Sequence, residues 1–138
     1  VYEERVRSLV IEKNLQDNVI FTGYQPNVAD YLNVMNVVIH ASVLPEPFGR
    51  VLLEAMAMKK PVIGARGGAV PEIIVDGDTG LMFTPGDDAE LAQEVAGLLE
   101  DSGRAKEMGE NGYKRAGQDF GIKKNVQKTQ QLYERLFS

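Results

Sequence analysis

Two glutamates flank a glycine bend in segment 45–54, which has the sequence PEPFGRVLLE. Pro47 and Gly49 interrupt the chain just before a run of strong helix formers, so we expect a helix to begin here. The first N–H groups of a helix have no partner within it, and such an end binds phosphate readily. Glu46 and Glu54 add carboxylates, whose two oxygens can accept hydrogen bonds from paired hydroxyl groups. The segment therefore predicts a site for an anion and a sugar.

Arg50 is expected in the first turn of this helix, where the positive end of the helix dipole disfavours a cation. A nearby negative group would offset that cost, and the candidates are a ligand phosphate, Glu46 and Glu54. Pairing with Glu54 would place the arginine before the glutamate, which is the less favourable order on a helix. The backbone amides that we expect to be unpaired donors are those of Phe48, Gly49, Arg50 and Val51.

The elements that must position these residues alternate between apolar runs and helical patterns. The runs predicted as strands are 19–23, 37–40, 61–64 and 81–83. Helices are predicted over 1–14, 28–33, 71–75, 87–100, 103–116 and 123–137, with Asp87 or Asp88 as a cap. A central helix is predicted to begin at the Gly49 bend and to end before Lys59. This alternation predicts an α/β fold with a doubly wound parallel sheet, whose ligand sites lie beyond the carboxyl ends of the strands.

Several further residues fall at that end of the predicted sheet. Gly67 and Gly68 either admit a phosphate or sugar close to the backbone or form a simple turn after a strand. His40 is the only histidine of the chain, and we expect it to serve structure more than chemistry. Asp76 and Asp78 form an Asp-x-Asp pattern, but the glycine between them predicts a turn rather than a metal site.

Composition excludes several classes of protein. The 138 residues suit one domain, and 43% hydrophobic with 25% charged residues is ordinary for a globular chain. A formal net charge of −5 argues against general binding of nucleic acid. The chain has no cysteine, which excludes disulfides and thiolate metal sites and suits a reducing cytoplasm. No stretch resembles a membrane span or a signal peptide.

Segment 41–86 joins EPFGRVLLEAMA to PVIGARGGAVPEII and DGDTGLMFTPGD. With this combination the chain resembles the C-terminal, donor-binding domain of retaining glycosyltransferases of the GT-B fold, family 4 type (glycosyl transferases group 1). The resemblance implies a Rossmann-like domain and a UDP- or GDP-linked sugar donor. It further implies transfer of a hexose to a saccharide or lipid-linked acceptor, with no cofactor and no metal. A cytoplasmic protein is expected, or one peripheral to the inner face of the membrane at full length.

The same resemblance assigns roles to individual residues. Glu46 would be the catalytic residue and bind hydroxyls of the transferred sugar, while Glu54 would accept from the ribose hydroxyls. The amides of Phe48, Gly49 and Arg50 would face the sugar and phosphate, and those of Val51 and Leu52 would reach the diphosphate. Tyr24 and Gln25 would lie where the family contacts the base, although Tyr24 could equally be a packing residue. Gly67 and Gly68 complete the expected donor-binding set.

The resemblance also implies parts that precede Val1 in relatives. These are an acceptor-binding N-terminal domain and the first two strands of the donor domain, so residues 1–138 are expected to form a single partial domain. With the usual strand order 3-2-1-4-5-6, the missing strands would lie between 19–23 and 37–40. The exposed edges could then pair with another copy, as a homo-oligomer or by strand swapping. In complete relatives the last helix crosses to the N-terminal domain, so we expect Leu132, Leu136 and Phe137 to be partly uncovered.

Two other functions stay open. One is a non-catalytic fragment that self-associates, and the other is a nucleotide-sugar epimerase of the same architecture, although epimerases lack the EPFGRVLLE pattern. Lys59 is a departure from the family, which usually has glycine there. If the backbone keeps a positive φ at this position, lysine would cost about 1 kcal/mol.

Overall fold

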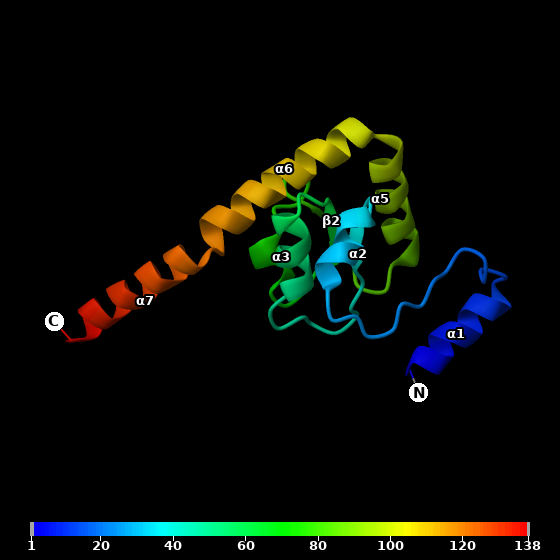
Figure 1. The fold of residues 1–138 in the computed structure, drawn as a ribbon, viewed down its shortest axis with the longest axis horizontal. Coiled ribbons are helices and arrows are strands. Elements are labelled where there is room, and N and C mark those ends of the chain that lie inside the picture. Colours follow the sequence, from blue (N-terminus) through cyan, green and yellow to red (C-terminus); the bar gives the residue numbers. More distant parts are fainter. Residues whose placement is uncertain (1, 138) are drawn as a thin grey trace.

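A short parallel sheet lies at the centre of the chain in the computed structural model, which describes residues 2–137 (Figure 1). The strands are β1 (Val38–His40), β2 (Val62–Ala65) and β3 (Leu81–Phe83), and their order across the sheet is β1-β2-β3. Val38 pairs with Val62, and Ile63 pairs with Leu81. β2 and β3 are buried throughout, as expected for parallel strands that are covered on both faces. The predicted doubly wound α/β fold is therefore confirmed.

The helices of the described residues are α1 (Tyr2–Glu12), α2 (Val28–Val34), α3 (Arg50–Ala57), α4 (Val70–Ile73), α5 (Asp88–Glu100), α6 (Ser102–Asp119) and α7 (Ile122–Phe137). Those that cover the two faces of the sheet include α3, α5 and α6. Successive side chains of a strand point to opposite faces. Val62 accordingly packs in one apolar cluster with Leu52 and Met56 of α3, whereas Ile63 packs in another with Leu98 of α5 and Met108 of α6.

The segment 19–23, which we predicted as a fourth strand, has no regular secondary structure. An isolated strand gains no ladder hydrogen bonds, and among the described residues β1 pairs with β2 alone. Ile20 is consequently 88% exposed. The preceding helix α1 contacts this segment through the Arg7 guanidinium, which lies 4.1 Å from the centre of the Phe21 ring. No residue of α1 is buried, and Figure 1 shows it apart from the sheet.

Two aspartates cap the helices that follow the sheet. The Asp87 carboxylate accepts from the Glu90 amide at 2.9 Å, which confirms the predicted cap of α5. The Asp101 carboxylate accepts from the Arg104 amide at 2.9 Å and caps α6 in the same way. The connection between α5 and α6 is therefore a single residue, and it lays α6 back against the sheet and α3.

The chain after α3 makes a close backbone approach to α6. Lys59 has a φ of +59°, so the positive φ that the family glycine suggested is present. The Lys59 side chain contacts α6, because its Nζ lies 3.0 Å from Glu110 Oε1 and over the Tyr113 ring. Lys60 Nζ donates to the Asn33 carbonyl at 2.6 Å. Both lysines therefore stabilise the junction of helices, and they follow a helix C-terminus, where the helix dipole favours cations.

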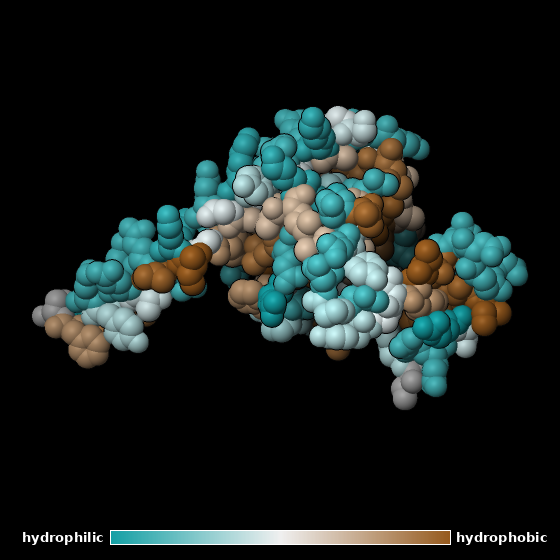
Figure 2. Space-filling model, viewed as in Figure 1, coloured by the Kyte–Doolittle hydropathy of each residue, from teal (hydrophilic) through white to brown (hydrophobic). Residues whose placement is uncertain are grey.

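The last helix, α7, extends away from the sheet (Figure 1). No residue of α7 is buried, and Leu132, Leu136 and Phe137 are each more than half exposed, as expected. Figure 2 shows hydrophobic residues at the surface over α1 and near the start of α7. Within residues 2–137, no helix has both the length and the apolar character needed to cross a membrane.

Gly109 should be the glycine at which added volume disrupts this packing. A Cβ atom at position 109 would lie 2.2 Å from the Lys59 carbonyl oxygen, and a backbone atom cannot move aside cheaply. We expect Gly109→Ala to lower the free energy of unfolding by about 1–3 kcal/mol. Urea unfolding followed by amide signals of β2 measures this change.

The control is Gly97→Ala in α5, where a Cβ atom would meet nothing within 4 Å. Alanine should stabilise that helix by up to about 1 kcal/mol through its helix propensity. Equal responses of the two variants would contradict the packing described for Gly109.

Candidate active site

The loop between β1 and α3 holds the Glu46 carboxylate on both oxygens. Oε1 accepts from the amides of Gly49 at 3.0 Å and Phe48 at 3.2 Å, and Oε2 lies 3.2 Å from His40 Nε2. The amides of Gly49 and Phe48, with a smaller contribution from His40, hold the pKa of Glu46 below its ordinary value of 4.5 against the opposing effect of burial. Glu46 is therefore an ionised, oriented carboxylate.

Glycine at position 49 makes this arrangement possible. Gly49 is the residue before α3 and has a φ of +74°, a conformation that other residues adopt at a cost. A Cβ atom there would also lie 2.8 Å from Ile73 Cδ1. The bend turns the chain from the Glu46 loop into the helix, so the amides of Phe48 and Gly49, just before the helix, face the carboxylate.

The free donors at the tip of α3 differ from those that we predicted. The amides of Phe48 and Gly49 are bound by Glu46, because the loop brings a carboxylate to the helix start. The Leu52 amide donates to the Gly49 carbonyl at 3.1 Å. In the described part of the chain, the amides of Arg50 and Val51 have no acceptor. The tip therefore offers two backbone donors to a ligand.

Arg50 pairs with Glu54, one of the three partners that the sequence left open. Arg50 Nη2 lies 3.1 Å from Glu54 Oε1, one turn along α3. The tip is open to solvent, since the Arg50 side chain is 79% exposed and Phe48 is 60% exposed. The Arg50 side chain is therefore accessible from solvent, beside the two free amides.

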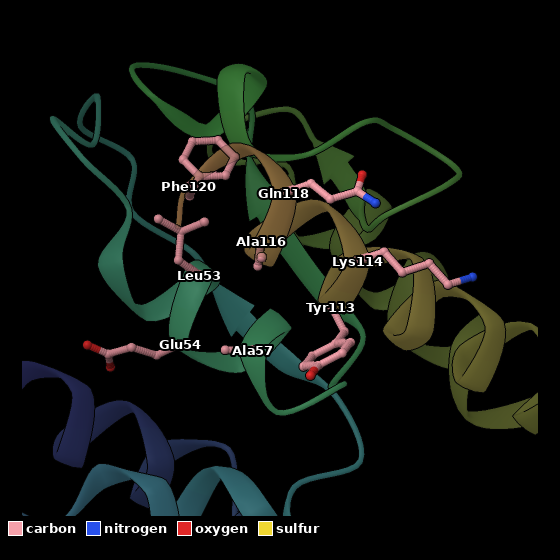
Figure 3. A pocket seen from close by; sticks show the side chains of 9 residues that line it. Leu53, Glu54, Ala57, Tyr113, Lys114, Ala116, Gln118 and Phe120 are labelled. Atoms are coloured by element: carbon pink, nitrogen blue, oxygen red, sulfur yellow. The ribbon is translucent and has the colours of Figure 1, made fainter. Parts of the chain in front are cut away.

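Glu54 stands beside an apolar groove between α3 and α6. In Figure 3 its carboxylate points outward from α3, whereas Leu53, Ala116 and Phe120 face one another across the groove. The groove has a volume of about 490 Å³. Its lining residues are Leu53, Glu54, Ala57, Tyr113, Lys114, Ala116, Gly117, Gln118 and Phe120.

Gly68 supports the Glu46 loop from the other side. The Glu46 carbonyl accepts from the Ala69 amide at 2.8 Å. Gly68 has a φ of +54°, and a Cβ atom there would lie 2.2 Å from the Glu46 carbonyl oxygen. Gly67 is less constrained, since the nearest neighbouring atom would lie 4.0 Å from a Cβ atom added there. At Gly68 the close approach is therefore to the protein's own backbone, and the choice between a ligand contact and a simple turn stays a prediction.

Tyr24 and Gln25 are not joined to this cluster. Tyr24 is 92% exposed, and the Gln25 side chain donates to the Thr22 carbonyl at 2.6 Å. Over residues 2–137 we find no hydrogen bond or ion pair that links either residue to Glu46 or Glu54. They follow the segment 19–23, which lacks the strand that would fix their position.

The Asp76 turn is structural, as predicted. Its Oδ2 lies 2.8 Å from Arg66 Nη2, and its Oδ1 accepts from the Met82 amide at 2.8 Å. Gly77 has a φ of +82°, which allows the chain to reverse before β3. Both carboxylate oxygens of Asp76 are thus engaged within the protein.

The contact of His40 with Glu46 was not predicted from the sequence. His40 ends β1, and its neighbour in space lies six residues further along a loop without regular structure. The available signal was the position of both residues at the same end of the sheet. That signal indicates proximity but not which side chains touch.

Comparison with known protein families gives one match that covers most of the chain. The family described as "Glycosyl transferases group 1" matches residues 1–115. A similar curated protein is the N-acetyl-alpha-D-glucosaminyl L-malate synthase of Bacillus anthracis, with 37% identity over 128 residues. The alignment covers 93% of this chain and 33% of that protein. The chain thus spans about a third of the length of the first curated relatives that it matches.

Solved structures give the same result. The Alr3699/HepE protein of Anabaena in complex with UDP is similar with a TM-score of 0.89 and 32% identity, over 98% of this chain and 36% of that one. The C-terminal domain of a glycosyl transferase group 1 family protein, LpcC of Francisella tularensis, is similar with a TM-score of 0.80 and 30% identity. That comparison covers 88% of this chain and 63% of the solved one. The Rossmann-like fold of GT-B C-terminal domains is therefore shared.

Gly68→Ala should loosen the Glu46 loop. Alanine would need an unfavourable φ and would displace the Glu46 carbonyl, so we expect a loss of at least about 1 kcal/mol of the free energy of unfolding. The amide of Ala69 should also exchange faster with solvent. Gly67→Ala is the matched control and should change neither quantity greatly. Slow exchange of Ala69 in the Gly68→Ala variant would contradict the predicted displacement.

Glu46→Gln should reduce stability in a pH-dependent way. Because folding lowers the pKa of Glu46, the stabilisation is fully present above pH 4.5, the ordinary value, and is lost as pH falls through the lower folded pKa. The wild type should therefore exceed Glu46→Gln in stability at neutral pH by an amount that shrinks in acid. Urea unfolding of both proteins across this range measures the difference. A difference that is constant with pH would contradict it.

Proposed function

The chain belongs to the glycosyl transferases group 1 family, and on that premise we propose that it binds the nucleotide-diphospho-sugar donor of a retaining glycosyltransferase. The observation that carries the proposal is the tip of α3. An oriented Glu46 carboxylate, two free amides and the exposed Arg50–Glu54 pair converge there. The UDP complex of the similar Anabaena protein is consistent with a nucleotide ligand.

The donor would lie across this tip, with its parts matched to the groups present. Glu46 accepts from a hydroxyl of the sugar, and the amides of Arg50 and Val51 donate to the phosphates. The Arg50 guanidinium turns to the diphosphate, which leaves both oxygens of Glu54 available to the ribose hydroxyls. The base lies toward Tyr24 and Gln25. The strands that would fix the position of these two residues are not among residues 2–137. Phe48, Gly49, Leu52, Gly67 and Gly68 serve mainly by shaping the loop.

The chemistry follows from the charges that develop during transfer. Departure of a nucleoside diphosphate places negative charge on the β-phosphate, and the sugar becomes oxocarbenium-like. Oriented amides and a guanidinium stabilise that charge without reorganising, and we propose that neither metal nor cofactor is needed. Donor and acceptor would meet on one face of the sugar, which gives retention of configuration.

Transfer would require more protein than this chain contains. The chain covers about a third of its curated relatives, and we propose that the acceptor is bound by a preceding domain in a cytoplasmic or membrane-peripheral protein that transfers a hexose. Residues 1–138, as one partial donor domain, would bind a UDP- or GDP-linked donor weakly and would not catalyse transfer.

Self-association is a second candidate, favoured by the open edge of the sheet. β1 has an unpaired edge among the described residues, and Ile39 is exposed there. Such an edge is a template for pairing with another copy. Sedimentation at increasing protein concentration distinguishes the two cases, because a monomer that binds nucleotide supports the donor-binding function alone.

Nucleotide titration tests the proposed function. We expect UDP, GDP or ADP to shift the amide signals of Arg50 and Val51 first, because these are the free donors. Glu54→Gln should weaken the preferred nucleotide by about tenfold, the effect of losing one hydrogen bond to a charged group. Glu100→Gln in α5 is the control and should bind as the wild type does. Shifts confined to residues outside 46–54, or unchanged affinity of Glu54→Gln, would refute the proposal.

A further inference from the structure

His40 lies behind the Glu46 carboxylate, at the carboxyl end of β1. Its side chain is 15% exposed, and Nε2 is 3.2 Å from Glu46 Oε2. In the described part of the chain, the Gly49 and Phe48 amides and His40 lower the pKa of Glu46, and burial raises it. His40 is the one titratable group among these influences. The imidazole is therefore the single side chain that fixes the second oxygen of this carboxylate.

The chemistry of the pair sets which nitrogen carries the hydrogen. An ionised carboxylate only accepts hydrogen bonds, so a favourable contact at 3.2 Å requires the hydrogen on Nε2. The other nitrogen, Nδ1, is buried and has no hydrogen-bond partner among residues 2–137. A hydrogen placed on Nδ1 would leave a buried donor unpaired, which is costly. The surroundings thus favour the tautomer that directs Nε2–H at Glu46.

The donors around Glu46 leave little of its hydrogen-bonding capacity unused. A carboxylate has about four lone-pair sites, two on each oxygen. The amides of Phe48 and Gly49 occupy both sites of Oε1, and His40 occupies one site of Oε2. One site on Oε2 remains. That site can accept from a single hydroxyl, whereas the sequence predicted that such a carboxylate holds paired hydroxyls.

We propose that His40 is a positioning residue, which holds Oε2 of Glu46 so that the carboxylate presents one acceptor to one hydroxyl of the donor sugar. The claim that Glu46 binds one sugar hydroxyl rests on the proposed function, whereas the claim that His40 orients Glu46 does not. His40 itself would act through the carboxylate, because its side chain is largely buried and its Nε2 lies 3.2 Å from Oε2.

The first test measures Glu46 directly in two matched variants. His40→Gln keeps an N–H group near the position of Nε2, whereas His40→Leu keeps volume and removes the donor. The carboxyl carbon signal of Glu46 should titrate at the lowest pH in the wild type, at a higher pH in His40→Gln and at the highest pH in His40→Leu. The amide shifts of Phe48 and Gly49 should follow the same order. Unchanged titration of Glu46 in His40→Leu would overturn the proposal.

The second test separates the sugar from the nucleotide. UDP and UDP-glucose are the probes, and the quantity measured is the ratio of their dissociation constants for each variant. His40→Leu should lose about tenfold in that ratio, with the affinity for UDP itself unchanged, and His40→Gln should restore most of the loss. An equal loss for UDP and UDP-glucose would indicate a general packing role and overturn the proposal.

The two tests also separate failure of this inference from failure of the proposed function. If neither probe binds the wild type, donor binding is refuted, and the titration of Glu46 still decides whether His40 positions it. Urea unfolding of both variants shows whether each of them keeps the fold. The single histidine of the chain gives an unambiguous ring signal, which should show the Nε2–H tautomer in the wild type.

Discussion

The site depends on the way in which one residue, Glu46, is tied to three different elements. Its carbonyl is held by the Ala69 amide after β2, one oxygen of its carboxylate by the tip of α3, and the other by His40 at the end of β1. Gly68 allows the first contact by having no side chain. Because these three elements belong to the sheet or pack against it, they fix the position of the loop relative to the core. A carboxylate on a loop is thereby placed as firmly as one on a strand.

This anchoring also changes the electrostatics of the helix start. A free helix tip attracts anions through its dipole and its unpaired amides. Here a resident carboxylate uses two of those amides, and the remaining attraction comes from two amides and Arg50. In the proposed complex, phosphate would therefore lie beside a negative group rather than in a uniformly positive pocket. Such an arrangement would separate the place for a sugar from the place for a diphosphate along a single turn of backbone.

Much of the fold could be predicted because its signals are local. The strands ending at His40, Ala65 and Phe83 are short apolar runs that a buried parallel sheet requires, and Asp87 has the side chain of a helix cap. The run 19–23 has the same composition but no ladder partner, and composition carries no information about partners. Likewise the sequence located Glu46, Arg50 and Glu54, but not the contacts that His40, Gly49 and Gly68 make with Glu46, since these depend on how separate loops meet.

Helix α1 is joined to the rest of the chain by a long coil and buries none of its residues. An isolated helix of this length is marginal in water, so it should fray independently of the sheet. Circular dichroism would then record the melting of α1 at temperatures where β2 is intact, and the transitions seen by different probes would not coincide. A single melting temperature would then not describe residues 2–137, and α1 would be heterogeneous in conformation while the sheet is ordered.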